Sequence, residues 1–417
     1  MAIAVTPPRG MRDFLPADKA VREHSLGIIR ENFRAHGFDE IETPVMEDSA
    51  RLHSGLGGDN EKLAFAVLRR GLTAADVAAA AGQNDLLSLA DLGLRFDLTV
   101  PLARFYATHR AALPAVFRSI QIAPVWRAER PQKGRYRQFM QCDIDIIGEA
   151  GPLAEIELIT ATVATLDKLG LTGCSIRIND RRILTALLAH WGVASELRER
   201  ALIVIDKLDK IGVNGVAAEL EAQGIGAQGL AALLTELGTG GWSLGDSAPA
   251  WLDTVAFADL LALRSALPNV TLDFDPTLVR GMGYYTGTIF EISHPDLAYS
   301  LGGGGRYDGM IGRFLGTEVP ACGFSIGFER IVDLLKTDDA SADKAVVLVY
   351  EKDADLATLV ALKRDLVADG LRVSLERRTK NLKALLDRAG ASGYGRFAFV
   401  TAATGSIADL EFKPLSS

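Results

Sequence analysis

The densest group of chemically capable side chains lies between residues 125 and 141, where the sequence reads Val-Trp-Arg-Ala-Glu-Arg-Pro-Gln-Lys-Gly-Arg-Tyr-Arg-Gln-Phe-Met-Gln. The pattern predicts a strand, a basic loop made flexible by Gly134, and a second strand. In the second strand Arg137, Phe139 and Gln141 share one face, because strand side chains alternate at period two. Guanidinium groups hold phosphate and an aromatic ring stacks on a base, so this face suits a nucleotide. A surface hairpin with an ordinary ion pair is the alternative.

A second segment, residues 278–291, reads Leu-Val-Arg-Gly-Met-Gly-Tyr-Tyr-Thr-Gly-Thr-Ile-Phe-Glu. Its glycines let backbone approach a ligand closely. Arg280 has the charge to neutralise a phosphate or carboxylate, and the hydroxyls of Tyr284 and Tyr285 can orient a polar ring. A turn that leads into a core strand with aromatic packing explains the segment equally well.

Four consecutive glycines at residues 302–305 suggest a phosphate-binding loop, but no Gly-Lys-Ser/Thr follows them and the Walker pattern is absent. We therefore predict a flexible turn beneath a ligand. Farther on, Arg330 is predicted in the first turn of a helix, where the helix dipole disfavours a cation. A bound polyphosphate would make that placement favourable.

Three acids, Asp97, Asp143 and Asp145, lie near these motifs, and the last two share the strand face of Gln141. A carboxylate beside a glutamine suits an amino group or an imidazole N–H. A solvated strand edge is the alternative. The six histidines lack metal-ligand spacing, so no zinc site is predicted.

Hydrophobic periodicity predicts the elements that position these residues. We expect a helix over residues 16–36, a strand over 38–45, and helices with loops over 62–92. Further strands are predicted at residues 94–98, 121–126, 138–147, 174–178, 287–292 and 322–326. Several strands are separated by 20 or more residues, which favours a long antiparallel sheet flanked by helices over a series of hairpins.

The sequence changes texture twice after residue 189. Residues 190–267 are rich in Ala, Leu and Gly with helical periodicity, which predicts a helical insertion. A polar linker follows at residues 337–344. Beyond it, strands at residues 345–350, 371–375 and 397–401 alternate with helices at 354–368 and 381–389. This alternation predicts a small separate α/β domain.

Composition limits the function classes. The 417 residues are enough for two or three domains, and 48% hydrophobic with 24% charged residues is typical of a soluble globular enzyme. No apolar run reaches the roughly 18 residues of a membrane span, and the first residues do not resemble a signal peptide. Three scattered cysteines exclude a disulfide framework and fit a reducing cytosol. The net charge of −8 leaves nucleic-acid binding to local basic patches at residues 127–137 and 372–388, unless these are only solvated faces.

Taken together and in order, these motifs resemble the class II histidyl-tRNA synthetases. Residues 37–44 resemble motif 1, residues 127–148 motif 2, residues 278–285 the histidine-binding signature of that family, and residues 323–330 motif 3. The opening Arg-Gly-Met-Arg-Asp-Phe-Leu-Pro also fits the family. The resemblance covers essentially the whole chain.

The resemblance implies an α+β fold, with a class II antiparallel sheet core, flanking helices, a helical insertion and a small C-terminal α/β domain. Residues 1–189 would be the first part of the catalytic core with motifs 1 and 2, and residues 190–267 the insertion. Residues 268–336 would complete the core with the histidine signature and motif 3. Residues 345–417 would be a short domain of the anticodon-binding type.

The implied activity is ATP-dependent activation of L-histidine to histidyl-adenylate and its transfer to the 3′ end of tRNA(His). ATP would be a substrate together with Mg²⁺, for which no protein ligands are assigned. The resemblance also implies a cytoplasmic homodimer with no membrane attachment, and it places the motif 1 proline, Pro44, at the dimer interface.

The same resemblance assigns roles residue by residue. The catalytic residues would be Arg127, Arg280 and Arg330. ATP would be bound by Arg127, Glu129, Arg137, Phe139 and Arg330. Histidine would be bound by Asp97, Thr99, Gln141, Asp145, Arg280, Tyr284, Tyr285 and Tyr307. The acceptor end of tRNA would meet Gln132, Lys133 and Arg135.

The chain also departs from the family pattern. Met282-Gly283 stands where Leu-Asp usually precedes the tyrosine pair, which removes an acid from the pocket. The C-terminal domain is short, and another strand or helix is expected where it ends. Two other functions remain open from sequence: a non-catalytic paralogue resembling the regulatory subunit of ATP phosphoribosyltransferase, and an RNA-binding protein without catalysis.

Overall fold

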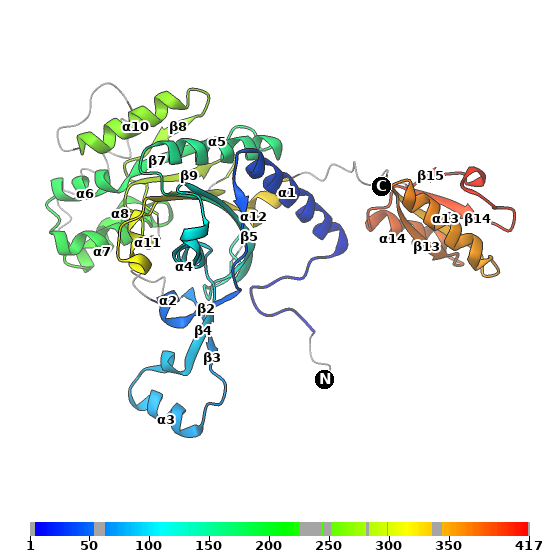
Figure 1. Cartoon of the computed structure of the whole chain (residues 1–417), viewed down its shortest axis with the longest axis horizontal. Helices are drawn as coiled ribbons and strands as arrows, with labels where there is room; N and C mark the ends of the chain where they lie inside the picture. The colour runs from blue at the N-terminus through cyan, green and yellow to red at the C-terminus, as the bar shows by residue number, and fades with distance from the viewer. Residues whose placement is uncertain are drawn as a thin grey trace. The chain divides into compact units, whose positions relative to one another are not determined.

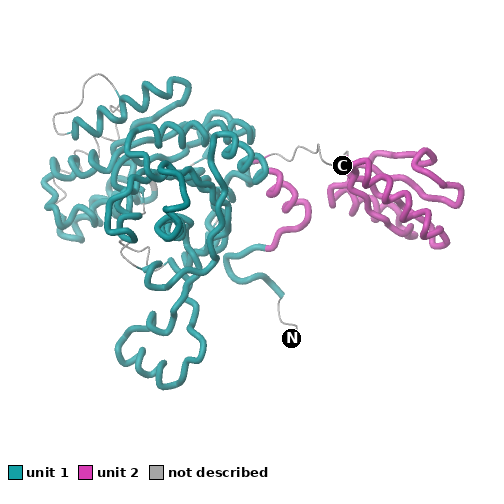
Figure 2. The backbone as a smooth tube through the Cα atoms, viewed as in Figure 1, with its two compact units in different colours: residues 1–12, 25–334 teal, residues 13–24, 335–417 magenta. Residues whose placement is uncertain are grey.

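The computed structural model describes residues 5–53, 63–132, 134–225, 244, 252–280, 283–297, 299–335 and 344–415. The chain forms two compact units, residues 1–12 with 25–334, and residues 13–24 with 335–417 (Figure 2). The first unit holds a large sheet with its flanking helices, and the second holds a small sheet of its own (Figure 1). Within the described ranges, none of the helices combines the length and hydropathy that a membrane crossing requires.

The large sheet has eight strands in the order β1-β5-β6-β11-β10-β9-β7-β8. Every neighbouring pair is antiparallel except the two outer ones, β1 with β5 and β7 with β8, which are parallel. This sheet confirms the predicted α+β class and its antiparallel core. The strands are β1 (Asp39–Glu40), β5 (Phe117–Trp126), β6 (Gln138–Ile147), β7 (Ser175–Asp180), β8 (Leu272–Phe274), β9 (Thr288–Ser293), β10 (Gly302–Arg306) and β11 (Ala321–Gly327).

The glycine run is the main correction to the sequence-based elements. Residues 302–305 were predicted as a turn, but they form most of β10, a central strand paired with both β9 and β11. Glycine has a low strand propensity, so the sequence gives no strand signal here. The neighbours require glycine nevertheless: a Cβ on Gly304 would come within 1.9 Å of the Gly323 carbonyl oxygen.

Two other predicted strands are wrong or shortened. Residues 95–98 form a buried connection to helix α4 (Thr99–His109) rather than a strand, although Phe96 and Leu98 are fully buried and imitate strand alternation. Arg95 fixes this connection, because its guanidinium donates to the Thr43 carbonyl at 2.7 Å and to the Pro124 carbonyl at 3.0 Å. Of the strand predicted at residues 38–45, only β1 forms.

Residues 46–53 and 63–94 contain strands that the sequence does not predict. Strands β2 (Met46–Asp48), β4 (Ala90–Leu94) and β3 (Phe65–Leu68) form a separate antiparallel sheet. This sheet and α3 (Ala74–Gly82) extend away from the large sheet (Figure 1). The other elements here are α2 (Ser49–His53) and the short 3-10 helix η2 (Leu86–Leu89).

Helices cover the large sheet and hold its strands in place. The first is α1 (Pro16–Ala35), as predicted, and Asn32 on it donates to Thr165 on α5 (Leu153–Lys168) at 2.8 Å. Helix α5 packs on β11 and β6, and α4 packs on α11 (Asp308–Leu315). The short helices η3 (Arg110–Ala112) and α12 (Phe328–Val332) follow α4 and β11.

The described residues of the predicted insertion are helical. They form the end of α6 (Arg181–His190), then η4 (Ser195–Leu197), α7 (Arg198–Ile205), α8 (Leu208–Ala222) and α10 (Thr254–Ala266). Val204 and Leu220 share a buried cluster with Leu278 and Ile289, so α7 and α8 pack on the loop and strand that follow β8. Residues 226–243 and 245–251 lie outside the described residues.

The second unit contains a four-stranded sheet in the order β13-β12-β14-β15. β12 (Ala345–Tyr350) runs parallel to β13 (Arg372–Arg377) and β14 (Arg396–Val400), as alternating strands and helices require. Helices α13 (Leu356–Ala368) and α14 (Leu382–Ala391) connect them, η6 (Ile407–Asp409) follows, and β15 (Lys413–Pro414) pairs antiparallel with β14. Residues 336–343, most of the predicted linker, lie outside the described residues.

Candidate active site

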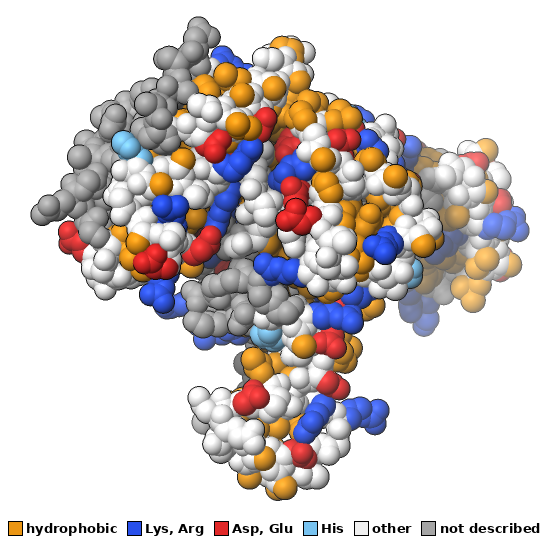
Figure 3. Space-filling model, turned by 60° about the vertical axis from the view of Figure 1, so that its left-hand side comes forward, with side chains coloured by type: hydrophobic (Ala, Val, Ile, Leu, Met, Phe, Trp, Pro, Cys, Tyr) orange, Lys and Arg blue, Asp and Glu red, His pale blue; other side chains and the backbone are white. Residues whose placement is uncertain are grey.

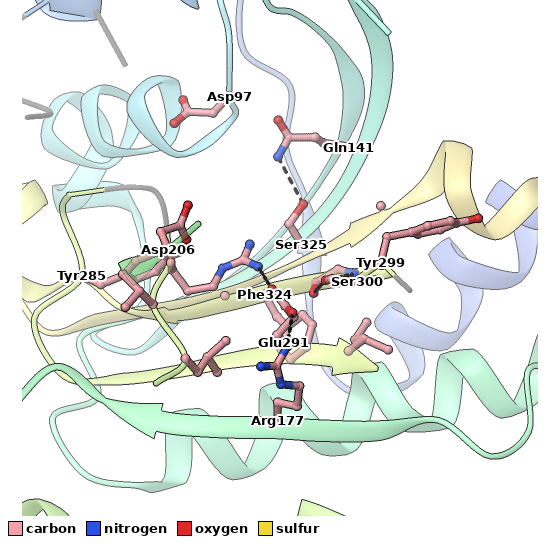
Figure 4. Close-up of a pocket in the computed structure, with 18 of the residues that line it drawn as sticks. Asp97, Gln141, Arg177, Asp206, Tyr285, Glu291, Tyr299, Ser300, Phe324 and Ser325 are labelled. Atoms are coloured by element: carbon pink, nitrogen blue, oxygen red, sulfur yellow. Dashed lines mark hydrogen bonds and ion pairs between the residues drawn. The ribbon is translucent and has the colours of Figure 1, made fainter. Parts of the chain in front are cut away.

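A cavity of about 1220 Å³ lies on one face of the large sheet and collects most of the chemically capable residues. Strands β6, β9, β10 and β11 provide its floor. Its walls come from the connection before α4, the loop between β5 and β6, the loop before β9, and the junction of α7 and α8. Figure 4 shows side chains from these separate segments pointing into one space.

Three buried carboxylates mark one end of the cavity. Asp97, Asp143 and Asp145 are each no more than 4% exposed, although all three line the cavity. Burial raises the pKa of Asp97 to about 6. Burial also raises the pKa of Asp145 to about 7, against the opposing effect of its hydrogen bond from Tyr307. Such carboxylates gain from a cationic or proton-donating ligand that replaces lost water.

Two of the acceptor atoms at this end have no hydrogen-bond donor within the part of the chain that the structure describes. The Gln141 amide nitrogen donates to Asp143 at 3.1 Å and to Ser325 Oγ at 3.2 Å, which turns the amide oxygen the other way. That oxygen is buried and has no partner among the described residues, and the same holds for Asp97 Oδ2. Buried polar atoms are nearly always satisfied, so this pair indicates a site for a donor such as an ammonium group.

Aromatic side chains enclose the space beside Asp145. The Tyr307 hydroxyl donates to Asp145 Oδ1 at 2.6 Å. The Tyr284 ring lies edge-on to the Tyr307 ring at 5.9 Å and contacts the Tyr285 ring at 4.8 Å. Gly323 makes room for the carboxylate, because a Cβ there would come within 1.9 Å of Asp145 Oδ1. A carboxylate held at the edge of an aromatic pocket suits a small ring that carries an N–H.

Elsewhere in the cavity the lining is positively charged, because arginines face it. Arg127 donates through Nε to the Phe96 carbonyl at 3.0 Å, and its guanidinium lies 5.0 Å from the Phe139 ring centre. Arg330 donates to the Ser300 carbonyl and lies over the Tyr299 ring. Burial, together with the charges of Arg135 and Arg280, lowers the pKa of Arg330 below its ordinary value. Several cations facing one space favour a polyanion as the ligand.

The beginning of α12 confirms the placement of Arg330 predicted from sequence, since this helix starts at Phe328. Glu329, the residue before Arg330, is buried. Its carboxylate accepts hydrogen bonds from the Met140 backbone N–H at 3.0 Å and from the Arg12 guanidinium. The N-terminal segment and β6 are thereby tied to the helix that carries Arg330.

A sequence model of the histidyl-tRNA synthetase family matches residues 10–331, more than half of the chain. The chain belongs to the histidyl-tRNA synthetase family. A histidine–tRNA ligase from Leifsonia xyli subsp. xyli is 64% identical over 100% of both chains. A probable histidine–tRNA ligase from Tropheryma whipplei is 43% identical over 95% of this chain and 96% of the relative.

Solved structures agree on the fold of the histidyl-tRNA synthetase family. One, a histidyl-tRNA synthetase from Nostoc sp. PCC 7120, superposes with a TM-score of 0.77 at 24% identity and covers 99% of this chain and 95% of that one. Another is an ATP phosphoribosyltransferase regulatory subunit/histidyl-tRNA synthetase from Bacillus halodurans C, with a TM-score of 0.74 at 22% identity over 96% and 100% of the two chains. At these identities the likeness shows the fold alone.

Most residues that the family resemblance singled out do line the cavity of this histidyl-tRNA synthetase family member. Arg137 does not: its Nε donates to the Glu129 carbonyl at 3.0 Å and its backbone N–H to the Gly10 carbonyl at 2.7 Å. The predicted common face fails at Arg137 because β6 begins one residue later, so strand alternation does not extend to it. The lining set comprises Asp97, Thr99, Arg127, Glu129, Arg135, Phe139, Gln141, Asp145, Arg280, Tyr284, Tyr285, Tyr307 and Arg330.

The loop between β5 and β6 folds back as a tight turn. Gln132 and Arg135 exchange two backbone hydrogen bonds of 3.1 and 2.8 Å, and Gly134 between them adopts a positive φ of 73°. The Arg135 guanidinium pairs with Glu129 at 3.1 Å. Gln132 is exposed, and Lys133 lies outside the described residues. Met282 also lies outside them, while Gly283 lines the cavity without adding an acid.

Sequence reasoning missed many charged or polar residues of the cavity, and four of them stand out by their contacts or burial. Arg177, Asp206, Glu291 and Ser325 all line it (Figure 4). Burial raises the pKa of Asp206, despite the nearby cations Lys210 and Arg280. Asp206 follows α7, and Arg177 lies on β7, far in sequence from every motif. Of these four, only Glu291 and Ser325 fall inside segments that the sequence singled out, and there their strand alternation with cavity-facing neighbours was the available signal.

Proposed function

We propose that the protein activates L-histidine with ATP to give histidyl-adenylate and pyrophosphate, and then transfers histidine to the 3′ end of tRNA(His). The observation that carries this proposal is the pair of unpartnered buried acceptors, Asp97 Oδ2 and Gln141 Oε1, in the same cavity as the arginines. One cavity would thus contain a binding site for an ammonium group and a binding site for phosphates. Family membership supports the same assignment.

The acidic end is the proposed histidine seat. Asp97 and Gln141, with the Thr99 hydroxyl beside them, would hold the α-ammonium group. Asp145, fixed by the Tyr307 hydroxyl, would accept a hydrogen bond from the imidazole N–H. The rings of Tyr284 and Tyr285 would enclose the imidazole. Selectivity would follow because an amino acid without that N–H leaves a buried carboxylate unpaired.

The arginine-rich part is the proposed ATP seat. Arg127 and Arg330 would hold phosphates, and Phe139 would stack on adenine with the Glu129 carboxylate near its amino group. Arg280 would neutralise charge at the α-phosphate. Arg137 stays in the proposed ATP set because its Nε donates to the Glu129 carbonyl, although Arg137 itself does not line the cavity.

The chemistry would then be transfer of the adenylyl group of ATP to the histidine carboxylate, followed by acyl transfer. A carboxylate oxygen of histidine attacks the α-phosphorus, a new P–O bond forms, and the bond to the β-phosphate breaks so that pyrophosphate leaves with the electron pair. A terminal ribose hydroxyl of tRNA next attacks the acyl carbon, and AMP leaves. Positioning and neutralisation of charge by fixed arginines supply most of the rate.

Mg²⁺ is proposed as part of the nucleotide substrate. Among the described residues, no three His, Cys, Asp or Glu side chains form a group that could hold a metal ion. Mg²⁺ commonly binds through substrate phosphates and waters with one or two carboxylates, so a preformed protein cage is unnecessary.

The tRNA contacts are proposed at two places. The turn that carries Gln132, Lys133 and Arg135 lies at the cavity, where the acceptor end must enter for acyl transfer. Residues 345–417 are proposed as the anticodon-binding domain. Its basic segment supports this role, because Arg372 and Arg378 lie over the Tyr394 and Phe399 rings and so combine cations with stacking surfaces.

We also propose a homodimer in the cytoplasm. Pro44, Val45 and Met46 are consecutive exposed apolar residues, and Leu68 and Leu86 are exposed on the projecting sheet segment, where Figure 3 shows hydrophobic side chains at the surface. A second copy of the chain would cover such a surface.

A Val45→Asp variant is expected to sediment as a monomer while the wild type sediments as a dimer. A wild-type monomer at micromolar concentration would contradict the proposal.

Pyrophosphate–ATP exchange with each of the twenty amino acids tests the activity. Exchange is expected with histidine alone, and tRNA(His) charging is expected in a second assay. Folded protein that gives no exchange with any amino acid would favour the regulatory paralogue. tRNA binding without exchange would favour an RNA-binding protein. Neither is favoured now, because Arg127, Arg280 and Arg330 line the cavity and the C-terminal unit is present.

A further inference from the structure

Four charged side chains form a line across the end of the large sheet and finish at Arg280. Asp275 accepts from Arg177 Nε at 3.1 Å. Arg177 Nη1 reaches Glu291 Oε1 at 3.2 Å, and the other oxygen of that carboxylate accepts from Arg280 Nη1 at 2.7 Å. Negative and positive charges therefore alternate from Asp275 to Arg280. Figure 4 shows Arg177 and Glu291 at the floor of the cavity.

The sheet holds the first three members of this line in register. Arg177 on β7 and Glu291 on β9 are direct cross-strand partners. Asp275 directly follows β8, and its backbone N–H donates to the Ile178 carbonyl at 3.0 Å. Its second carboxylate oxygen accepts from the Thr277 N–H at 2.8 Å and the Thr277 hydroxyl at 2.6 Å. Both acids are thus fixed by their backbones or by neighbouring groups.

Arg280 itself lies on the loop before β9 and depends on side-chain contacts for its position. Its guanidinium rests over the backbone of β10, since a Cβ on Gly303 would come within 2.8 Å of Nη1. Its buried Nε has no hydrogen-bond acceptor among the described residues. Glu291 is the ion-pair partner of Arg280 that the structure shows.

The two oxygens of the Glu291 carboxylate bind different arginines, and this arrangement sets the orientation of the Arg280 guanidinium. Each guanidinium takes one oxygen, so Glu291 holds Arg280 through a single amino group. Carboxylates otherwise prefer the two-pronged pair with one arginine, which fixes the guanidinium plane and neutralises its charge. Without Arg177, the whole carboxylate becomes available to Arg280.

We propose that Arg177 is a positioning residue for the adenylation step: by occupying one oxygen of Glu291, it keeps Arg280 in a one-pronged pair that leaves the guanidinium directed at the α-phosphate. Asp275 anchors Arg177 in this role. The inference rests on the function proposed above, in which Arg280 acts on that phosphate.

The test is steady-state pyrophosphate exchange by Arg177→Met in the full-length protein. The expected result is a fall in kcat of about 10- to 100-fold with KM for histidine and ATP within about two-fold, because the contact matters in the transition state and not in ground-state binding. Arg118→Met is the matched control: Arg118 is similarly exposed and forms a two-pronged pair with Glu157, outside the cavity. Its kcat is expected to stay within about two-fold of wild type.

A double-mutant cycle separates positioning from general damage. If Arg177 acts through Arg280, adding Arg177→Met to Arg280→Lys lowers kcat by less than about two-fold further. Arg177→Lys is expected to recover part of the activity, since a lysine reaches Glu291 but cannot bridge both acids. If Arg177→Met does not fold, Asp275→Asn replaces it, with the same pattern expected.

Three outcomes would overturn the inference. These are an unchanged kcat, multiplicative losses in the double mutant, and an equal loss in Arg118→Met. Wild-type protein that exchanges with no amino acid would refute the proposed function itself, and the inference would fall with it. Wild-type exchange with histidine, combined with unaltered Arg177 variants, would refute the inference alone.

Discussion

Asp97 and Asp145 keep carboxylates inside the protein where burial opposes their ionised forms. Their pKa values are raised to about 6 and about 7, from an ordinary value near 4. Between about pH 4 and pH 7 the native state therefore binds more protons than the unfolded state. The free energy of unfolding must fall as pH rises through that window, because the native protein then loses protons that it holds more tightly. The proposed histidine site therefore destabilises the ligand-free protein, and a bound cation is expected to offset that cost.

Replacing Asp97 by Asn should stabilise the empty protein and inactivate it. We expect the free energy of unfolding at pH 7.5 to rise by on the order of 1–3 kcal/mol, since the buried charge is removed. Histidine-dependent pyrophosphate exchange should fall at least about 100-fold, because the α-ammonium group loses its counter-charge. Urea unfolding and exchange kinetics measure the two effects. Asp39→Asn, at an exposed acid of β1, should change neither.

The pH dependence of that gain is a second, independent prediction. The stability difference between Asp97→Asn and wild type should be near zero at about pH 3 and below, where the carboxyl group is mostly protonated in both states. It should grow through pH 6 and level off above pH 7, following the raised pKa of Asp97. Urea titrations at half-unit pH intervals measure it. A stability difference that does not vary with pH would show that the pKa of Asp97 is not raised in the native state.

The cavity residues found from sequence lie in recognisable motifs, whereas the missed residues Arg177 and Asp206 lie outside every motif. Arg127, Gln141 and Tyr285 stand in segments whose composition is unusual for a plain strand or turn. Arg177 and Asp206 stand alone in ordinary amphipathic segments, so their importance arises only from cross-strand pairing and helix packing. Pairings of that kind are set by tertiary structure and leave no local signal.

At the scale of elements, strands with alternating apolar residues were predictable, but the strand made almost entirely of glycine was not. Strand β6 coincides with its predicted bounds, because its residues alternate between polar and apolar and its second half is buried. Strand β10 has no such pattern. Strands β3 and β4 were missed because Ala-rich sequence around them favours helix, and their pairing depends on contacts between distant residues. Predicted strand 94–98 failed because burial, not pairing, explains its apolar residues.

The pairing of β11 with β6 makes Gly323 a sensitive position. A Gly323→Ala variant should lose most histidine activation, because the new methyl group displaces the Asp145 carboxylate from the Tyr307 hydroxyl. We expect KM for histidine to rise at least about 10-fold and the melting temperature to fall by several degrees. Exchange kinetics and calorimetry measure these effects.

Gly309→Ala is the control for that experiment. It lies in helix α11, and its added methyl group would meet nothing closer than 3.9 Å. Alanine is favoured over glycine in a helix, so this variant should be neutral or more stable by about 0.5–1 kcal/mol. Equal damage in both variants would show that the close contact at Gly323 is not the cause.

At the scale of the whole molecule, residues 344–415 have what an independent domain needs. Apolar clusters lie on both faces of the small sheet, one built with α13 around Leu348 and Leu362, and one built with α14 around Val347 and Leu385. The alternation of strands and helices made this organisation predictable, since each crossover must cover a face. The proposed homodimer rests on exposed apolar residues, and composition alone does not identify which apolar residues are exposed.

Separating the two parts of the chain should separate the two half-reactions. A protein ending at residue 335 is expected to keep histidine-dependent pyrophosphate exchange within about three-fold of wild type, while tRNA(His) charging falls at least about 10-fold because anticodon contacts are lost. Residues 344–417 alone should unfold cooperatively in urea and bind tRNA weakly. Full charging by the shortened protein would remove the C-terminal unit from the proposed tRNA site.

The glycine strand β10 has a consequence for how this gene can vary. A Cβ at Gly302, Gly303, Gly304 or Gly305 would come within 2.5, 2.5, 1.9 or 2.5 Å of a neighbouring backbone oxygen, so no position has room for even a methyl group. Every missense change from a glycine codon adds at least that group. Four adjacent codons should therefore tolerate changes only at the third base, and a saturation library should show there a twelve-base window in which nearly all surviving variants are synonymous.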